Sequence, residues 1–344
     1  MNQQKLLTWS QQYLPAHISP PQSPGLAPVS GDAGFRSYYR LNSQPTVIAV
    51  DAPPEHEDVP GFVEKALFLD RAGIHVPHIH AVDFQAGYML LEDLGDQLLL
   101  GSLNENSVAS HYDSAESVLL ALQQLPPDTA FDDYSRAKLL QEMSLFPEWF
   151  VMQLLGLEMS PGQQEVITSA FELLASNALE QPQVLVHRDF HARNLMLQPD
   201  SSLGVIDFQD AVVGPITYDL VSLLRDCYIR WPREMVEQRV AAFYQRSVAQ
   251  GSLPEVGEAR FMRWFNLMGL QRHLKVLGIF ARLWLRDGKP GYLSDLPLVM
   301  RYVLEQTAIF PELSQLHSWL LESIVPIARG HEWYRDWQTA GEHL

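Results

Sequence analysis

Apolar and aromatic residues between positions 29 and 92 fall into short runs, a pattern typical of β-strands. Phe62, Ala66 and Leu69 instead recur at helical spacing and share one face of a predicted helix. Gly73 follows that face and is predicted to end the helix. The runs are bounded by Gly, Pro and Asp and are predicted as strands at residues 35–41, 46–50, 79–84 and 87–92. This part of the chain is therefore expected to be a β-rich lobe that contains one helix.

The residues before this lobe predict a short helix that ends near Leu14 and is followed by a proline-rich connector. The prolines of the connector are Pro15, Pro20, Pro21, Pro24 and Pro28. Proline fixes φ and lacks a backbone N–H donor, so the connector is expected to run as an extended tether or covering strap.

Helical periodicity dominates after Gly95. The predicted helices are residues 107–125, 134–155 and 162–178, with further helices from residue 217 almost to the end. A strand-rich island at 184–207 interrupts them. Thr217 is expected to cap the helix that starts there, with Asp219 in its first turn.

These patterns divide the chain into three segments, at residues 1–30, 31–95 and 96–344. The predicted fold class is α+β, with a small β-rich N-terminal lobe and a larger, mainly helical C-terminal lobe. A cleft between two lobes is a natural place for a ligand.

Composition narrows the functional classes. The chain has 344 residues, of which 47% are hydrophobic and 19% are charged, so it can bury a substantial core and is not expected to be disordered. Its formal net charge of -17 argues against a general binder of nucleic acid or anionic membranes, because such binders need positive charge at the phosphates. The charge does not show whether the acidity attracts a cationic substrate or only keeps the protein soluble. A small-molecule substrate is what the resemblance described below implies, and the chain is expected to be a monomer.

Cysteine content and hydropathy point to a cytoplasmic protein. The one cysteine, Cys227, excludes an intramolecular disulfide framework and a cysteine-based zinc cluster. No uninterrupted apolar run has the length needed to span a bilayer, and residues 1–9 lack the pattern of a secretory signal.

The island at 184–207 carries the residues with the clearest chemistry. Asp189 and Asn194 lie in one loop between two apolar strands, and Asp207 follows the apolar pair Val205-Ile206. This order predicts two carboxylates and an amide at the ends of adjacent strands. Oxygen ligands of this kind suit Mg²⁺, which proteins commonly hold with few side chains plus substrate phosphates. The alternative is that these residues serve only as turn formers.

The same residues resemble the catalytic and metal-binding loops of the protein-kinase-like superfamily. His187, Asp189 and Asn194 match the pattern H-x-D-x-x-x-x-N, and Asp207-Phe208-Gln209 resembles D-F-G. The sequence around Gly214-Pro215 and Tyr218-Asp219-Leu220 is similar to the aminoglycoside phosphotransferase and choline kinase branch, whose members phosphorylate small molecules. Three stretches resemble the amino-sugar 1-kinases of cell-wall recycling, which act on C1 of N-acetylmuramate and N-acetylglucosamine: residues 31–40, 51–54 and 218–226.

The resemblance implies a bilobal fold in which residues 31–95 bind nucleotide and residues 96–344 carry catalysis and substrate binding. It implies that Asp189 is the catalytic base or orienting carboxylate for the acceptor hydroxyl. Asn194 and Asp207 would hold Mg²⁺, and Asp219 would hold the catalytic loop through backbone donors.

The resemblance also implies where ATP binds. The loop with Gly31, Asp32 and Gly34 would cover the phosphates with backbone N–H groups. The carbonyl of Glu92 and the N–H of Leu94 would contact adenine through the backbone, so side chains there do not distinguish ATP from GTP.

One expected residue of the family is absent from its usual strand. Protein kinases carry a lysine there, but the strand at 47–51 has none. The whole chain has five lysines: Lys5, Lys65, Lys138, Lys275 and Lys289. Either Arg36 or Arg40 supplies the positive charge, or the protein binds nucleotide or sugar without turnover. Of the two arginines, Arg36 is the predicted ATP-binding residue.

Two arginines are candidates for the acceptor side. Arg225 and Arg272 are predicted sugar contacts, because the carboxylate of N-acetylmuramate needs a cation. The alternatives left open are an aminoglycoside, which would need acidic residues, a choline-like alcohol, or a non-catalytic binding module.

Overall fold

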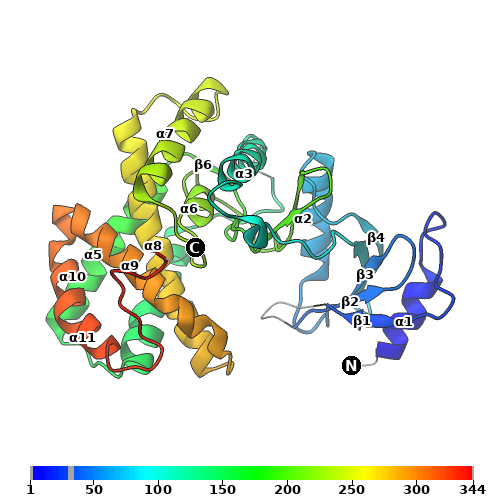
Figure 1. Ribbon diagram of the computed structural model, residues 1–344, viewed down its shortest axis with the longest axis horizontal. Coiled ribbons are helices and arrows are strands. Elements are labelled where there is room, and N and C mark those ends of the chain that lie inside the picture. The colour runs from blue at the N-terminus through cyan, green and yellow to red at the C-terminus, as the bar shows by residue number, and fades with distance from the viewer. Residues whose placement is uncertain (1–2, 30–34, 127, 343–344) are drawn as a thin grey trace. The chain divides into compact units, whose positions relative to one another are not determined.

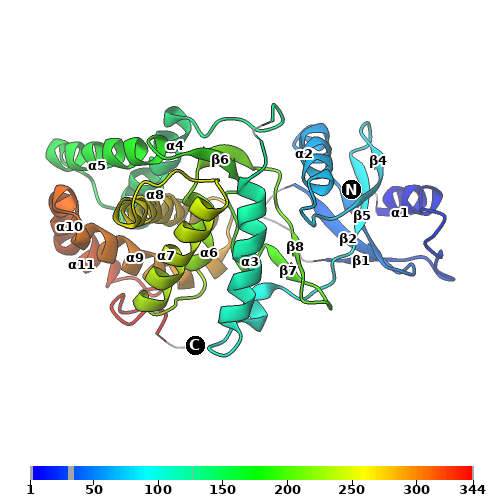
Figure 2. The same cartoon turned by 90° about the horizontal axis from the view of Figure 1, so that it is seen from above.

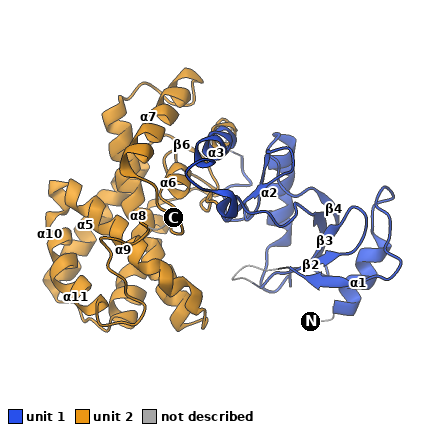
Figure 3. Ribbon diagram, in the orientation of Figure 1, with its two compact units in different colours: residues 1–118, 128–131, 193–211 blue, residues 119–127, 132–192, 212–344 orange. Residues whose placement is uncertain are grey.

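The computed structural model describes residues 3–29, 35–126 and 128–342. Figure 1 shows the ribbon from the N-terminus in blue to the C-terminus in red. The chain divides into two compact units, coloured separately in Figure 3. Unit 1 comprises residues 1–118, 128–131 and 193–211, and unit 2 comprises residues 119–127, 132–192 and 212–344. Residues 193–211 therefore return late in the sequence to the unit formed by the N-terminal part.

Unit 1 is built on an antiparallel sheet with the strand order β1-β2-β3-β5-β4. The strands are β1 (Leu26–Pro28), β2 (Ser37–Leu41), β3 (Val47–Asp51), β4 (Ile79–Asp83) and β5 (Tyr88–Glu92). The register aligns Tyr39 with Ala49 and Ala49 with Leu90 across three strands. The four predicted strands are confirmed. Part of the predicted connector is an additional edge strand that ends at Pro28, a position where a missing N–H donor is tolerated.

Two helices in unit 1 bury apolar stripes. Helix α1 (Gln3–Gln12) packs through Leu6 and Trp9 on a cluster that includes Leu41 and Ala49. Helix α2 (Val59–Arg71) starts after Asp58, whose side chain accepts a hydrogen bond from the Gly61 N–H at 3.0 Å. The predicted stripe of α2 is buried, and the helix ends before Gly73, which has φ of 81°. Glycine tolerates this left-handed conformation, which stops the helix.

The island contributes a hairpin to unit 1. Strands β7 (Leu195–Leu197) and β8 (Leu203–Val205) pair antiparallel and lie between Asn194 and Asp207. The N–H of Val205 donates to the carbonyl of His75 at 2.7 Å, and the N–H of Leu197 donates to the carbonyl of Gln97 at 2.8 Å. The remaining elements here are the 3₁₀ helix η1 (Leu99–Ser102) and the start of α3 (Val108–Gln123).

Unit 2 is mainly helical. Helix α8 (Glu258–Leu285) runs through its core, and Figure 2 shows it between α5 and α9. The other long helices are α5 (Pro161–Leu179), α7 (Arg233–Ala249) and α9 (Leu296–Ile309). Strands β6 (Gln183–Val186) and β9 (Val212–Pro215) pair antiparallel.

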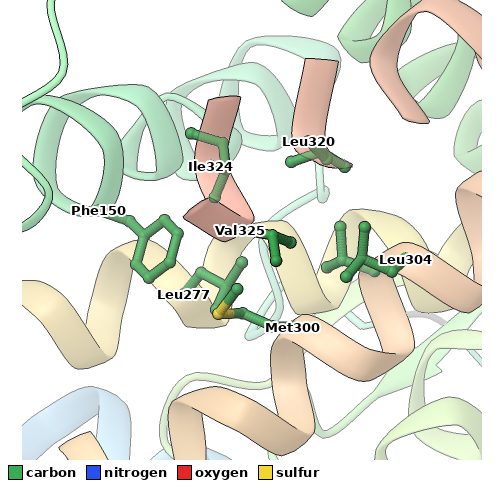
Figure 4. Close-up of a pocket in the computed structure, with 8 residues that line it drawn as sticks. Phe150, Leu277, Met300, Leu304, Leu320, Ile324 and Val325 are labelled. Carbon is green, nitrogen blue, oxygen red and sulfur yellow. The ribbon is translucent and has the colours of Figure 1, made fainter. Parts of the chain in front are cut away.

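The shorter helical elements of unit 2 complete its core. They are α4 (Arg136–Met143), η2 (Phe146–Leu154), α6 (Tyr218–Leu224), η3 (Pro290–Asp295), η4 (Pro311–Leu313), α10 (Ser314–Trp319), η5 (Leu320–Ile324) and α11 (Val325–Ala328). Figure 4 shows apolar side chains that converge from several helices of unit 2, among them Phe150 of η2, Leu277 of α8, Met300 of α9 and Ile324 of η5. This packing fixes α8, which carries residues of the candidate site.

Two local predictions are wrong for identifiable reasons. The predicted helix at 134–155 is divided, because α4 ends at Met143 and residues 146–154 form a π-helix. Pro147 lacks an N–H donor and so cannot continue the α-helical hydrogen bonds. Thr217 precedes α6, but no capping bond from its side chain is present among the described residues. Its hydroxyl donates to Gln181 Oε1 at 2.8 Å instead.

Among the residues that the structure describes, no helix combines the length and apolarity needed to cross a bilayer.

We predict that Gly278→Ala strongly destabilises unit 2. An added Cβ would overlap the carbonyl group of Leu145 and lie 2.6 Å from its Cβ, and backbone cannot move aside easily. The free energy of unfolding should fall by about 3 kcal/mol, measured by urea denaturation. Gly162→Ala is the matched control, because Gly162 is an exposed helical glycine with open space around its Cβ position. That variant should be about 0.5–1 kcal/mol more stable. Equal effects of the two substitutions would contradict the packing argument.

Candidate active site

Unit 1 contains a cavity of about 360 Å³ against one face of its sheet, within the range of small-molecule sites. Strand β3 lines it through Ile48, and the segment after β5 lines it through Glu92 to Asp96. The hairpin adds Asn194 and Asp207, two of the predicted metal-binding residues. The cavity therefore brings together the predicted adenine-contacting segment and the predicted metal-binding pair. Gly31, Asp32 and Gly34 lie outside the described residues.

The segment that follows β5 is held in place by its neighbours. The Glu92 N–H donates to the carbonyl of His78 at 2.8 Å, and the Leu94 carbonyl accepts from Gln198 Nε2 at 3.2 Å. Leu94 also packs directly over Gly204, where a Cβ would lie 2.7 Å from Leu94 Cδ1. Because Gly204 belongs to β8, a glycine in the hairpin permits the close approach of Leu94.

Asn194 and Asp207 lie close together in this cavity. Asn194 Nδ2 donates to Asp207 Oδ2 at 3.2 Å, and Gln209 Nε2 donates to Asp207 Oδ1 at 2.6 Å. Asp207 has φ of 65°, a conformation uncommon for a residue with a side chain. Within the described residues no cluster of three His, Cys, Asp or Glu side chains is suited to a metal. One carboxylate and one amide fit Mg²⁺, which takes most of its other ligands from phosphates and water.

The two candidate arginines of unit 1 have different surroundings. Arg36 Nε lies 2.9 Å from Glu57 Oε2, and its guanidinium lies 5.0 Å from the Phe62 ring centroid. Arg40 lines the cavity and pairs with Asp93 at 2.6 Å and Asp96 at 2.9 Å. The hydrogen bonds that Arg40 donates to these two carboxylates raise the pKa of Arg40 above its usual range, so it stays charged. Of these two arginines, Arg40 is therefore the one that lines the cavity.

Lys65 is a residue that sequence reasoning did not select. It lies on α2, and its Nζ donates to the backbone carbonyl of Gln209 at 2.5 Å. The side chain of Gln209 in turn binds Asp207. A positive charge thus reaches the predicted metal-binding loop from a helix rather than from β3. The scarcity of lysine in the chain was the signal that could have drawn attention to it.

The candidate catalytic loop is in unit 2 and has an unusual backbone. Arg188 has φ of 76°, which costs free energy for a residue with a Cβ. The buried carboxylate of Asp219 accepts from the N–H groups of His187 at 2.6 Å and Arg188 at 2.9 Å. Arg272 Nη1 donates to the Arg188 carbonyl at 2.8 Å. Both sides of this strained residue are therefore held by side chains from α6 and α8.

Asp189 itself is surrounded by positive charge. Its side chain is 39% exposed, and its Oδ1 lies 3.5 Å from Arg272 Nη1. Desolvation acts to raise the pKa of Asp189. The positive charges of Arg272 and Lys275 outweigh desolvation and hold the pKa of Asp189 well below its usual range. Asp189 is therefore ionised at any physiological pH and ready to accept a hydrogen bond from a hydroxyl group.

A buried polar network lies behind the loop. Glu142 accepts hydrogen bonds from Tyr134 and Arg188 and forms an ion pair with Lys275 at 3.0 Å. Lys275 also donates to the hydroxyl of Tyr218 at 3.2 Å. Burial acts to raise the pKa of Glu142, but Lys275 and Arg188 keep it below its ordinary value. The network thus balances the cations near Asp189 with a permanently charged carboxylate.

The two arginines predicted as sugar contacts are both buried, and their contact with a sugar stays a prediction. Arg272 is 3% exposed and holds the catalytic loop. Arg225 is 6% exposed, donates to Asn266 Oδ1 at 2.7 Å and lies 4.5 Å from the Phe265 ring centroid. These contacts lie in the interior of unit 2.

Aromatic residues that sequence reasoning missed extend from the catalytic loop. His191 contacts Tyr228 edge to face at 5.6 Å, and Tyr228 stacks with Phe280 at 6.3 Å. Phe280 then contacts Tyr292 at 5.1 Å. Tyr228 and Tyr292 are partly exposed. These residues come from three distant parts of the chain, so no local sequence pattern could reveal the row.

The fold and these residues define a phosphotransferase of protein-kinase-like architecture. The family profile described as the phosphotransferase enzyme family matches residues 25–258. The chain belongs to this family.

Relatives and solved structures agree with this assignment. A Pseudomonas putida protein named N-acetylmuramate/N-acetylglucosamine kinase is 42% identical over 298 residues, covering 86% of this chain and 88% of the relative. A Neisseria meningitidis serogroup B protein of the same name is 38% identical over 327 residues, covering 93% and 95%. An ADP-bound aminoglycoside phosphotransferase, APH(2'')-Ib, has a TM-score of 0.57 at 16% identity, covering 89% of this chain and 99% of its own. Choline kinase LicA from Streptococcus pneumoniae has a TM-score of 0.59 at 12% identity, covering 88% and 99%.

We predict that Asp219 sets an acidic limit to activity near pH 6. Burial raises the pKa of Asp219 to about 6, although His187 and the two N–H donors act to lower it. Protonation below that pH weakens its hydrogen bonds to the loop, so kcat should fall. The carboxyl binds more protons folded than unfolded between about pH 4 and 6, so its contribution to the free energy of unfolding increases as pH falls through that window.

The test compares kcat and urea midpoints over pH 5 to 8 in the wild type and Asp219→Asn. The variant should be slower at every pH and should lack the acidic limb near pH 6. An unchanged limb in Asp219→Asn would show that another group is responsible.

We also predict that Arg272→Gln lowers kcat by about 10²-fold, because a displaced catalytic group loses most of its positioning advantage. The KM for ATP should change little, since the cavity predicted to bind nucleotide is lined by residues of unit 1. Without the cation the pKa of Asp189 should rise toward its ordinary value, and the rate should become more sensitive to acid. Guanidinium added to the assay should restore part of the activity. Arg260→Gln, an exposed arginine on the same helix, is the control. A loss of stability with unchanged kcat would assign Arg272 a structural role only.

Proposed function

We propose that the protein is an ATP- and Mg²⁺-dependent kinase that phosphorylates the C1 hydroxyl of N-acetylmuramate and N-acetylglucosamine in peptidoglycan recycling. The observation that carries the proposal is the identity of 38–42% to relatives named for this activity over most of both chains. The presence of Asp189, Asn194 and Asp207 supports turnover rather than binding alone. The need for ATP agrees with the cytoplasmic location expected from the sequence.

In the proposed reaction, Asp189 orients the acceptor hydroxyl. Its ionised carboxylate accepts the hydroxyl hydrogen bond, which aims the oxygen at the γ-phosphorus of ATP. The new bond forms between the C1 oxygen and phosphorus, the bond from phosphorus to the β–γ bridging oxygen breaks, and ADP leaves. The hydroxyl proton passes to Asp189. Because the pKa of Asp189 is low, its main contribution is orientation, as is usual for phosphoryl transfer.

Asn194 and Asp207 are proposed to hold Mg²⁺, which would neutralise charge on the phosphate oxygens when bound. Arg40 and Lys65 supply positive charge at the cavity wall and beside the loop that follows β8. Together they are proposed to replace the family's strand lysine. On β3, where the family's lysine is expected, the residue that lines the cavity is Ile48. Val50 is the next residue on the same face, because side chains two positions apart share one face of a strand.

On the acceptor side, we propose that Tyr228 and Tyr292 contact the sugar. Both belong to the aromatic row that begins at His191, two residues after Asp189. Aromatic rings bury the apolar faces of sugar rings and leave the hydroxyl groups free to hydrogen bond. An aminoglycoside would need a carboxylate-rich surface in place of this row.

ADP release with N-acetylmuramate, N-acetylglucosamine, kanamycin and choline tests the proposal. ADP should form with the two amino sugars and not with kanamycin or choline. Asp189→Asn should lower the rate by about 10²–10⁴-fold while leaving ADP binding intact. Asp287→Asn, a surface substitution in unit 2, should leave the rate unchanged.

Two results would contradict the proposal. Turnover only with kanamycin or choline would assign another substrate in the same family. ADP binding without turnover of any acceptor would favour the non-catalytic module.

A further inference from the structure

A second buried carboxylate contacts the candidate catalytic loop, at the end opposite Asp219. Asp226 is 1% exposed, and its Oδ2 accepts from the N–H of Ala192 at 3.3 Å. Asp219 accepts from two N–H groups at the start of the loop. Because Asp219 and Asp226 lie close together in the sequence, one short segment of unit 2 holds both ends of the loop that carries Asp189.

The other oxygen of Asp226 holds Tyr228, a member of the aromatic row. Asp226 Oδ1 accepts from the Tyr228 N–H at 3.2 Å. Residues 226–232 form neither helix nor strand, so no regular backbone pattern fixes Tyr228. An aspartate side chain that accepts from an N–H two residues later commonly stabilises such a turn. The direction in which the Tyr228 side chain leaves the backbone therefore depends on Asp226.

The position of Asp226 is itself determined by its neighbours in the chain. His273 of α8 hydrogen bonds through Nε2 to the Arg225 carbonyl at 3.0 Å. Cys227 is 3% exposed and belongs to an apolar cluster of unit 2. The backbone is therefore anchored on both sides of Asp226. A carboxylate that is locked in this way can hold its two N–H donors in a definite geometry.

The loop and the aromatic row are joined at two points. Besides the Asp226 carboxylate, the ring of His191 in the loop contacts Tyr228 edge to face at 5.6 Å. A sugar that lay on Tyr228 would present its hydroxyl group to Asp189 only if both residues were in one register. An error of about 1 Å in such a register can lower the rate about 10²-fold.

We propose that Asp226 is a positioning residue that holds Tyr228 and Asp189 in the register needed for phosphoryl transfer to the sugar. This inference rests on the proposed function, because it takes Tyr228 as a sugar contact and Asp189 as the carboxylate that orients the hydroxyl. Asp226 acts through these two residues. Its loss is expected to change the sugar KM and kcat but not the KM for ATP, because the cavity predicted to bind nucleotide is lined by residues of unit 1.

A double-mutant cycle of Asp226→Asn and Tyr228→Ala tests the proposal. Asparagine keeps the size of the side chain, but its amide nitrogen cannot accept a hydrogen bond, so at least one of the two N–H groups loses its partner. Loss of either bond shifts Tyr228 relative to Asp189, so kcat should fall and the KM for N-acetylglucosamine should rise, each about 10-fold.

The second background separates positioning from a general structural effect. With Tyr228→Ala present, Asp226→Asn should change the sugar KM by less than about 2-fold, because the residue that it positions is gone. A merely structural role of Asp226 would raise the sugar KM equally in both backgrounds.

Amide hydrogen exchange tests the hold on the two segments without any acceptor. The amides of Ala192 and Tyr228 are followed in peptides that cover residues 187–192 and 226–230. At least one of them should exchange about 10-fold faster in Asp226→Asn, because an N–H that has lost its carboxylate is exposed to solvent more often. Thermal melts verify folding, and Asp226→Ser, whose hydroxyl is too short to reach both N–H groups, replaces Asp226→Asn if that variant does not fold.

Asp83→Asn is the matched control. Asp83 also accepts from two backbone N–H groups, those of Gln85 at 3.0 Å and Ala86 at 2.9 Å, but in a turn of unit 1. This variant should leave kcat, the sugar KM and the exchange of both peptides unchanged.

The outcomes distinguish this inference from the proposed function. A wild type that phosphorylates neither amino sugar contradicts the proposed function, and the exchange rates then decide whether Asp226 holds the two segments. Where the wild type does turn over the sugar, equal effects of Asp226→Asn in both Tyr228 backgrounds, or unchanged exchange of both amides, would overturn the inference.

Discussion

The conformation of the candidate catalytic loop depends on the side chains that hold the N–H and the carbonyl of Arg188. Arg188 has a positive φ, which a residue with a Cβ adopts only when its surroundings impose it. Asp219 imposes it from the N–H side, and Arg272 from the carbonyl side. Asp189 follows directly, so its position is determined by two buried charges on two helices. The packing of α6 and α8 in the core of unit 2 is thus the condition for an ordered Asp189 carboxylate.

Much of the fold was predictable because it follows from local patterns. The strands of unit 1 and the buried stripe of α2 were recovered from apolar spacing and from Gly73. The break in the helix at Pro147 and the missing cap at Thr217 depend on single hydrogen bonds, which periodicity does not report. The segment boundaries at residues 30 and 95 remain predictions. The return of residues 193–211 to unit 1 is a long-range property and has no local signal.

The candidate site was predictable only where one stretch of sequence carries it. Asp189, Asn194 and Asp207 occur at characteristic spacing, and the structure shows Asn194 bonded to Asp207. Arg225 and Arg272 were selected for their charge, but charge alone does not predict that both are buried, because burial is a property of the whole helix packing. Lys65 and the aromatic row from His191 to Tyr292 were missed because their partners are far away in sequence.

The absence of a lysine from β3 is best understood as a redistribution of charge. Val50 of β3 is fully buried, so a lysine in its place would have to be desolvated. Arg40 is instead paired with Asp93 and Asp96, and Lys65 reaches Gln209 from α2. Both cations therefore remain partly hydrated or hydrogen bonded before any phosphate arrives. A phosphate that approached Arg40 would have to compete with Asp93 and Asp96 for its guanidinium.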